Sequence, residues 1–335
     1  KYFFLVYFVV LFLIAISRLI LDISFLPTVF DLRFFIPISI SAMVLSLLVT
    51  PNISLICGAA TSLLIALMYQ LDFSVFLFLF LSNCTATFTA YKRTKRTELI
   101  NTGYVVGLFN VLFVFALGIF QEGSNVLWFT MNFIAAFFNG VLSSMISLAL
   151  LPYLESVFAI TTQQKLMELG NLNHPLLKKL MMTAPGTYQH SLMVATLAEA
   201  AAEAVNADPV VCRVGSYFHD VGKMKRPMFF SENQIAGENP HNTLSPRMSK
   251  LIIASHTKDG VEFAKKYKLP KVLQDIMLQH HGTALVSFFF TQALKTEEIS
   301  NIQGTKEEFR YPGPKPQFKE AVIIMMADTI EAAVR

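Results

Sequence analysis

Seven histidines lie in the second half of the chain, and none precedes residue 174. They are His174, His190, His219, His241, His256, His280 and His281. The strongest signal is His219, which is followed directly by Asp220 and comes after the apolar residues 214–218. A buried carboxylate needs a partner because its desolvation is costly. Imidazole and carboxylate ligands without thiolate favour iron, manganese or zinc, so the pair predicts a metal site.

The order of these residues resembles the HD phosphohydrolase superfamily, whose pattern is a His, then an adjacent His-Asp pair, then a distant Asp. The residues that fit the pattern are His190, His219, Asp220 and Asp328. Three further histidines match the subset of the superfamily that binds two metals, and they are His256, His280 and His281. The resemblance implies that the first set holds one ion and that Asp220 bridges to a second. His256 and His280 would hold that second ion, and His281 would complete its shell or contact substrate phosphate.

Two further segments narrow this likeness. Residues 280–283 read His-His-Gly-Thr, and residues 309–317 form a proline-rich stretch. Together with the membrane spans described below, they make the chain similar to the seven-transmembrane HD family, whose characterised members are PgpH-like cyclic di-AMP phosphodiesterases. The likeness implies hydrolysis of cyclic di-AMP to linear pApA. The chain departs from the family pattern, because six spans are predicted where the family has seven and the family's extracellular domain is absent. Truncation at the amino end would explain both differences.

The chemistry accounts for such a ligand set. Two metal ions about 3.5 to 4 Å apart activate water and stabilise charge on phosphoryl oxygens, so no protein nucleophile is required. Asp220 and Lys223 are the candidate catalytic residues, and Lys223 would hold a phosphate oxygen as a point charge. Arg310 and Tyr311, with His281 and Lys223, are the candidate substrate-binding residues, and Tyr311 would stack on a base.

Plainer interpretations of single residues stay open. The basic residues near Lys223 are typical of a solvated face, and Tyr311 would serve equally well in packing the proline-rich loop. His174 and His241 each lie next to a proline and are expected to be linker and loop residues.

The elements that must carry these residues are all helical. Hydrophobic residues make up 54% of the chain, and charge-free stretches long enough to cross about 30 Å of hydrocarbon predict six membrane spans. These cover residues 2–20, 34–50, 52–71, 73–91, 99–121 and 126–151. Polar residues inside the spans, such as Asn83 and Asn139, are expected to join neighbouring helices.

Orientation follows from a basic loop formed by Lys92, Arg93, Lys95 and Arg96. The positive-inside rule places this loop in the cytoplasm, and two further crossings return the chain to the same side. We therefore expect an all-α protein of a bacterial cell membrane: a transmembrane helical bundle over residues 1–151, a connecting helix over 152–180 and a cytoplasmic HD domain over 181–335. Three prolines within residues 312–316 predict a loop there.

Composition and motif limit the partners. A net charge of +4 without a clustered basic face argues against nucleic acid. The expected partners are a cyclic dinucleotide, membrane lipid, two divalent ions of iron or manganese, and an external ligand that binds an upstream region. Whether the protein forms a homo-oligomer stays open. Cyclic di-GMP is disfavoured because no Gly-Tyr-Pro follows the paired histidines. Enzymes that use one metal would not need His280 and His281, and a nucleotide-binding receptor that relays signals through the connector is the remaining alternative.

Overall fold

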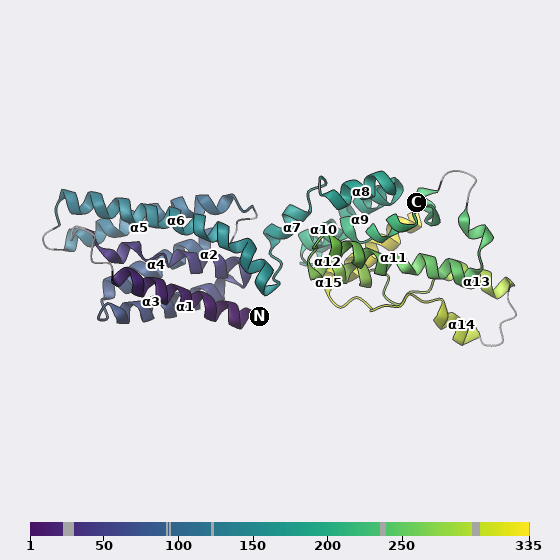
Figure 1. The fold of residues 1–335 in the computed structure, drawn as a ribbon, viewed down its shortest axis with the longest axis horizontal. Helices are drawn as coiled ribbons and strands as arrows, with labels where there is room; N and C mark the ends of the chain where they lie inside the picture. Colours follow the sequence, from purple (N-terminus) through teal and green to yellow (C-terminus); the bar gives the residue numbers. More distant parts are fainter. Residues whose placement is uncertain are drawn as a thin grey trace. The chain divides into compact units, whose positions relative to one another are not determined.

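A computed structural model of the chain describes residues 1–22, 30–91, 93, 95–121, 124–234, 239–296 and 302–334. Over these ranges the backbone forms α-helices and short 3-10 turns, with one isolated β-bridge and no strand. The all-α expectation is confirmed. The chain divides into a first unit, Lys1–Gln164, and a second unit, Lys165–Arg335 (Figure 1).

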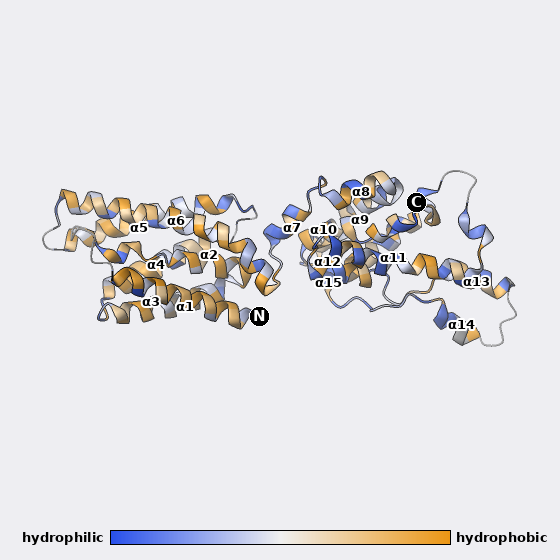
Figure 2. Cartoon of the chain, in the orientation of Figure 1, coloured by the Kyte–Doolittle hydropathy of each residue, from blue (hydrophilic) through white to orange (hydrophobic). Residues whose placement is uncertain are grey.

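Five helices of the first unit are long and apolar enough to cross a membrane among the residues described. They are α1 (Tyr2–Leu21), α3 (Pro51–Met68), α4 (Phe73–Ala90), α5 (Glu98–Phe120) and α6 (Val126–Phe158). Their ribbons are predominantly hydrophobic in the view of Figure 2, and large apolar side chains such as Phe3 and Phe120 lie exposed. A helix that is apolar all round requires a lipid environment, so this is a membrane protein.

The second expected span is not a continuous helix, and the prediction for residues 34–50 is wrong in this respect. The segment consists of a 3-10 turn, η1 (Leu32–Phe35), an extended stretch and the ten-residue helix α2 (Ser39–Leu48). Pro37 disfavours helical geometry at Ile36, which is extended. Asn139 on α6 donates to the carbonyl oxygens of Phe34 at 2.8 Å and Ile36 at 3.0 Å, so the freed carbonyls are satisfied inside the bundle.

The interrupted segment still runs alongside α4. Arg33 donates to Ser74 at the start of α4 (2.8 Å), and Ser39 at the start of α2 lies 2.9 Å from Ser82 near its middle. The bond between the hydroxyls of Ser39 and Ser82 joins α2 to α4, as expected for polar residues within the spans.

The last membrane helix is longer than expected. α6 continues through Pro152 to Phe158, so the boundary predicted at residue 151 falls inside a helix. Arg96 donates to Glu155 near its end (2.6 Å), and Gln164 donates to the carbonyl oxygen of Arg93 (3.1 Å). The described residues of the basic loop therefore lie beside the carboxyl end of α6; Lys92 falls outside the described residues.

The second unit is a helical domain in which four helices begin with proline, a residue preorganised for the first helical position. These are α8 (Pro175–Thr183), α9 (Pro185–Ala204), α10 (Pro209–Phe218) and α11 (Pro246–Lys266). The others are α7 (Gln163–Leu169), which begins at the boundary of the two units, α12 (Lys271–Gln279), α13 (Ser287–Thr296), α14 (Ile302–Glu308) and α15 (Lys319–Val334).

Helices α9, α10, α12 and α15 enclose a core that contains Phe218, Ile276 and Ile324. Between α10 and α11 the described residues form four 3-10 turns: η2 (Val221–Lys225), η3 (Pro227–Phe229), η4 (Ser231–Asn233) and η5 (Pro240–Thr243). Residues 311–317 are irregular, as the prolines predict.

Candidate metal centre

Five helical elements bring the predicted ligands into one buried cluster. His190 comes from the middle of α9, His219 and Asp220 from the junction of α10 and η2, His256 from α11, His280 and His281 from the end of α12, and Asp328 from α15. All are buried except His281, which is half-buried. The ligand atoms form two groups, each within 4.8 Å, that share Asp220.

The first group combines two imidazoles and two carboxylates. His190 Nε2 lies 3.0 Å from Asp328 Oδ1 and 3.5 Å from Asp220 Oδ2. His219 Nε2 lies 3.2 Å from the same oxygen of Asp220 and 3.8 Å from Asp328 Oδ1. Four donors directed at one point are the coordination that a divalent transition metal requires.

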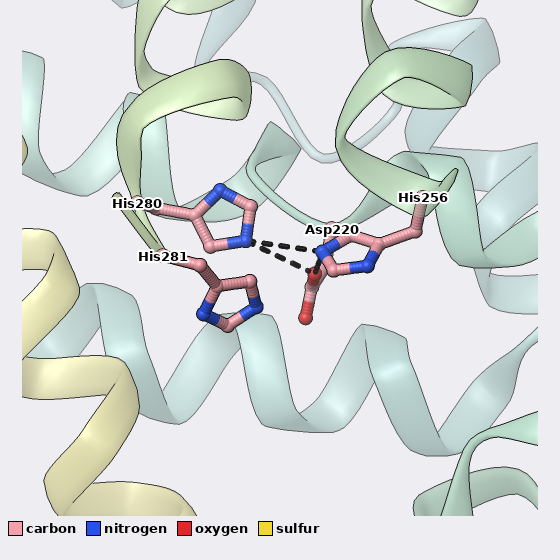
Figure 3. Close-up of side chains that lie close together, drawn as sticks. All are labelled: Asp220, His256, His280 and His281. Carbon is pink, nitrogen blue, oxygen red and sulfur yellow. Dashed lines mark hydrogen bonds and ion pairs between the residues drawn. The ribbon is translucent and has the colours of Figure 1, made fainter. Parts of the chain in front are cut away.

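The second group lies on the other oxygen of Asp220 (Figure 3). His256 Nε2 is 3.2 Å and His280 Nε2 is 3.6 Å from Asp220 Oδ1. His281 borders both groups, because its Nδ1 lies 3.6 Å from Asp328 Oδ2. One carboxylate thus presents a separate oxygen to each group, which is the arrangement of a bridging ligand between two ions.

Outer hydrogen bonds orient the rings. The Nδ1 atoms of His219, His256 and His280 lie 2.7, 2.6 and 3.0 Å from the carbonyl oxygens of Ser216, Ile253 and Met277. An Nδ1–H that donates to a carbonyl leaves the Nε2 lone pair for the interior, as metal-binding histidines require. No hydrogen bond reaches the buried His190 Nε2, His219 Nε2 or Asp220 Oδ1. These atoms need a cation, so the residues fit two divalent metals.

Electrostatics reinforce this conclusion. Burial alone would lower the pKa of each histidine, but the carboxylates of Asp220 and Asp328 outweigh it and raise the pKa of His190 to about 9 and that of His219 to about 10. The same imidazoles hold the pKa values of Asp220 and Asp328 far below the usual range, against the effect of burial. Beside the second group the balance is reversed, because burial lowers the pKa of His280 and of His281.

The structure brings two of the three other predicted residues to the cluster. Lys223 Nζ lies 2.7 Å from Asp220 Oδ2, and the ring of Tyr311 lies 4.3 Å from that of His281. Arg310 bonds instead to Glu307 (3.0 Å) and to the Thr283 carbonyl oxygen (3.0 Å). These contacts join Arg310 to α14 and to the segment after the paired histidines, so no described contact supports the expected role in substrate binding, which stays a prediction.

Two acidic residues of the site were not predicted. Glu331 Oε2 lies 2.6 Å from His190 Nδ1, and Glu232 lies 2.7 Å from Lys223 Nζ. Glu331 follows Asp328 by three residues on α15, so helical spacing could have identified it. Glu232 lies in a 3-10 turn and no sequence pattern marks it.

The two remaining histidines have structural contacts. His174 Nδ1 accepts a hydrogen bond from the Leu176 amide at the start of α8 (3.2 Å). His241 is buried in η5, with Nε2 2.9 Å from the carbonyl oxygen of Phe229. Neither belongs to the metal cluster.

Comparison with known proteins identifies the family of the chain. Residues 1–162 match the family described as 7TM receptor with intracellular HD hydrolase, and residues 187–333 match the HD domain. The chain belongs to the seven-transmembrane HD family. The recognition from the His and Asp order is confirmed, and the candidate metal ligands lie within the HD domain.

Two curated relatives carry the name cyclic-di-AMP phosphodiesterase PgpH. The chain is 40% identical to that of Bacillus subtilis (91% of this chain, 43% of the relative) and 39% identical to that of Listeria monocytogenes (98% and 45%). The chain thus spans less than half the length of these relatives. A crystal structure of the Listeria PgpH HD domain in complex with cyclic di-AMP is 52% identical, with a TM-score of 0.47 over 49% of this chain and 75% of that one.

Proposed function

We propose that this chain is the membrane-anchored phosphodiesterase portion of a protein that hydrolyses cyclic di-AMP to linear pApA. The observation that carries the proposal is the carboxylate of Asp220, which offers Oδ2 to one group of ligands and Oδ1 to the other. When bound, two divalent ions supply a hydroxide for attack on phosphorus and stabilise the phosphoryl oxygens. Iron or manganese suits this donor set.

The residues of the chain then have distinct roles. His190, His219 and Asp328 would hold the first ion and His256 and His280 the second, with Asp220 as the ligand shared by the two groups. His281, which borders both groups, would complete the coordination of the second ion or contact a phosphate of the substrate. No protein nucleophile is required, because the metal ions would supply the attacking hydroxide.

Lys223 and Tyr311 flank these ligands. The ammonium group of Lys223, held at Asp220, is a fixed positive charge for a nonbridging phosphate oxygen. The ring of Tyr311, next to His281, offers a face on which a base of the dinucleotide stacks.

The choice of adenine rests on the two relatives named PgpH and on a missing motif. The paired histidines are followed by Gly-Thr-Ala-Leu-Val-Ser, whereas HD enzymes that cut cyclic di-GMP have Gly-Tyr-Pro shortly after the pair. Cyclic di-AMP is therefore the substrate we infer.

We also infer that the second unit lies in the cytoplasm of a bacterial cell. The loop that contains Arg93, Lys95 and Arg96 carries the positive charge expected on the cytoplasmic side. Hydrogen bonds join this loop to the carboxyl end of α6, from which the chain continues into the second unit. Helices α5 and α6 together cross the membrane twice, so after α6 the chain is again on the side of the basic loop.

A receptor that binds nucleotide without cleaving it is the second candidate, and the description of the family as a receptor favours it. The complete ligand set argues against it, because a binding module has no need of two ions. An external stimulus acting through the first unit is compatible with both candidates.

The experiment is to purify the full chain in detergent, load it with manganese or ferrous iron, and incubate it with cyclic di-AMP and cyclic di-GMP before chromatography of the products. We expect linear pApA as the main product and about two ions per chain. Preference for cyclic di-GMP would contradict the substrate assignment, and metal-loaded protein without turnover would favour the receptor.

A further inference from the structure

We propose that Glu232 is a positioning residue that holds the ammonium group of Lys223 at the metal centre; this inference rests on the phosphodiesterase function proposed above. Lys223 Nζ lies 2.7 Å from Asp220 Oδ2 and 2.7 Å from Glu232 Oε1. The side chain of Glu232 is only 5% exposed and that of Lys223 is 12% exposed. The lysine therefore lies between two carboxylates, of which only Asp220 belongs to the ligand set.

The position of Glu232 is fixed by a helix that also carries a ligand. Thr187 Oγ1 donates to Glu232 Oε1 (3.0 Å), and the Thr187 amide donates to Asn233 Oδ1 (3.1 Å). Asn233 Nδ2 donates back to Thr187 Oγ1 (2.8 Å). Thr187 precedes His190 by three residues on α9, so the hydroxyl and the ligand share one face of the helix.

The two segments approach each other too closely for another side chain at Gly186. A Cβ atom at this position would lie 1.8 Å from the carbonyl oxygen of Glu232. The turn that contains Glu232 is thus docked on the backbone of α9. Phe230 of the same segment contributes its ring, whose centroid lies 5.0 Å from Lys223 Nζ.

The chemistry explains why a second anchor is needed. A lysine ammonium is a compact charge on a stem with four rotatable bonds, and it has no planar fork to fix its direction. The oxygens of Asp220 are also those that face the metal ligands. A separate carboxylate, itself fixed by Thr187, keeps the ammonium in place while Asp220 serves as the bridging ligand.

The proposal makes a prediction that simple electrostatics does not. Replacing Glu232 by Gln removes a negative charge from a site for an anionic substrate, which by charge alone would improve binding. We expect instead that kcat falls about 10- to 100-fold, as for other residues that support a catalytic group. KM should stay the same or fall, and the metal content should remain that of the wild type.

The decisive test is a double-mutant cycle on the full chain with Lys223→Met, Glu232→Gln and the double variant. If Glu232 acts through Lys223, E232Q slows the K223M variant by less than about twofold. The matched control is Glu262→Gln, which breaks a pair of similar length between Glu262 and Lys225 (2.6 Å) outside the metal centre; it should keep wild-type kinetics.

Three results would overturn the inference. They are a wild-type kcat in E232Q, loss of bound metal in E232Q, and a fall in kcat on adding E232Q to K223M that is as large as in the wild-type background. If E232Q does not fold, Thr187→Val removes the hydroxyl that fixes the carboxylate and enters the same cycle. All variants are also assayed with bis(p-nitrophenyl) phosphate. Failure to cleave cyclic di-AMP alone then contradicts the proposed substrate, whereas failure of the cycle with either ester contradicts the role of Glu232.

Discussion

Both units bury polar side chains, but they use them in opposite ways. Apart from Glu155, which pairs with Arg96, the buried polar groups described in the first unit are neutral hydroxyls and amides, such as Ser39, Ser82 and Asn139, and these three pair across helices. The second unit also buries a group of imidazoles and carboxylates, in which unpaired atoms of His190, His219 and Asp220 converge within a few ångströms. Isolated buried atoms without a hydrogen bond also occur in the first unit, as at Asn83, but none of them belongs to a cluster of ligand atoms among the described residues.

The difference shows which buried polar groups indicate packing and which indicate a ligand. A buried hydroxyl that is hydrogen-bonded to a neighbouring side chain is already satisfied in the folded protein and needs no ligand. A buried, charged oxygen without a hydrogen bond requires another cation. The predictions below test this contrast, from the largest expected effect to the smallest.

Replacing Asp220 by Asn should abolish hydrolysis. The amide nitrogen cannot ligate the second ion, so both groups lose their shared ligand and the metal content should fall well below two per chain. Metal analysis and product chromatography measure the two effects together. Asp275→Asn is the control, because it removes a carboxylate paired with Lys271 on the surface of α12 and should leave both values unchanged; an active D220N variant would refute the bridging role.

Removal of metal by a chelator should loosen the second unit and leave the first unchanged. The candidate ligands come from separate helices that bound ions would hold together, and a ligand that binds only the folded state stabilises it. Hydrogen exchange should therefore accelerate in α9 and α12 but not in α5. Equal acceleration in both units, or none, would argue against the contrast.

Replacing Glu331 by Gln should weaken metal binding or activity about 10- to 100-fold. The carboxylate lies 2.6 Å from His190 Nδ1 and increases the basicity of that ring, whereas a neutral amide does so less. Metal titration followed by calorimetry measures the change. The control is Glu307→Gln, which removes the partner of Arg310 (3.0 Å) away from the ligands; equal affinities in the two variants would contradict the role of Glu331.

Replacing Asn139 by Ala should destabilise the first unit by about 1 to 3 kcal/mol, because the carbonyl oxygens of Phe34 and Ile36 lose their donor. The metal content of the second unit should not change. Thermal unfolding in detergent provides the measurement, and Asn101→Ala, an exposed amide on α5, is the control. A loss of metal in N139A would show that the two kinds of polar burial are not independent.

Much of the fold is predictable from the sequence because burial in lipid and in a helical core both impose patterns that hydropathy detects. Five of the six expected spans and the all-helical character of the second unit follow from such patterns. The interruption at Pro37 does not, since its stability depends on an amide at Asn139, 103 residues from Ile36. The continuation of α6 through Pro152 was missed because proline usually ends a helix.

The candidate site likewise contains residues that the sequence predicts and residues that it does not. The order of His190, His219, Asp220 and Asp328 is a pattern that the sequence displays directly, and the structure brings these residues together; their roles as ligands remain predictions. Glu232 has no such pattern, because its contact with Thr187 joins a turn and a helix 45 residues apart. Arg310 shares a promising loop with Tyr311, yet its described contacts are with Glu307 and the carbonyl oxygen of Thr283 and not with the ligands.

The central claim is that Asp220 joins two ions into one centre. Electron paramagnetic resonance of the full chain loaded with manganese tests it most directly, because ions about 3.5 to 4 Å apart and bridged by a carboxylate are exchange-coupled. We predict a coupled signal that disappears in D220N. An isolated six-line manganese spectrum in the fully loaded wild-type protein would contradict the account.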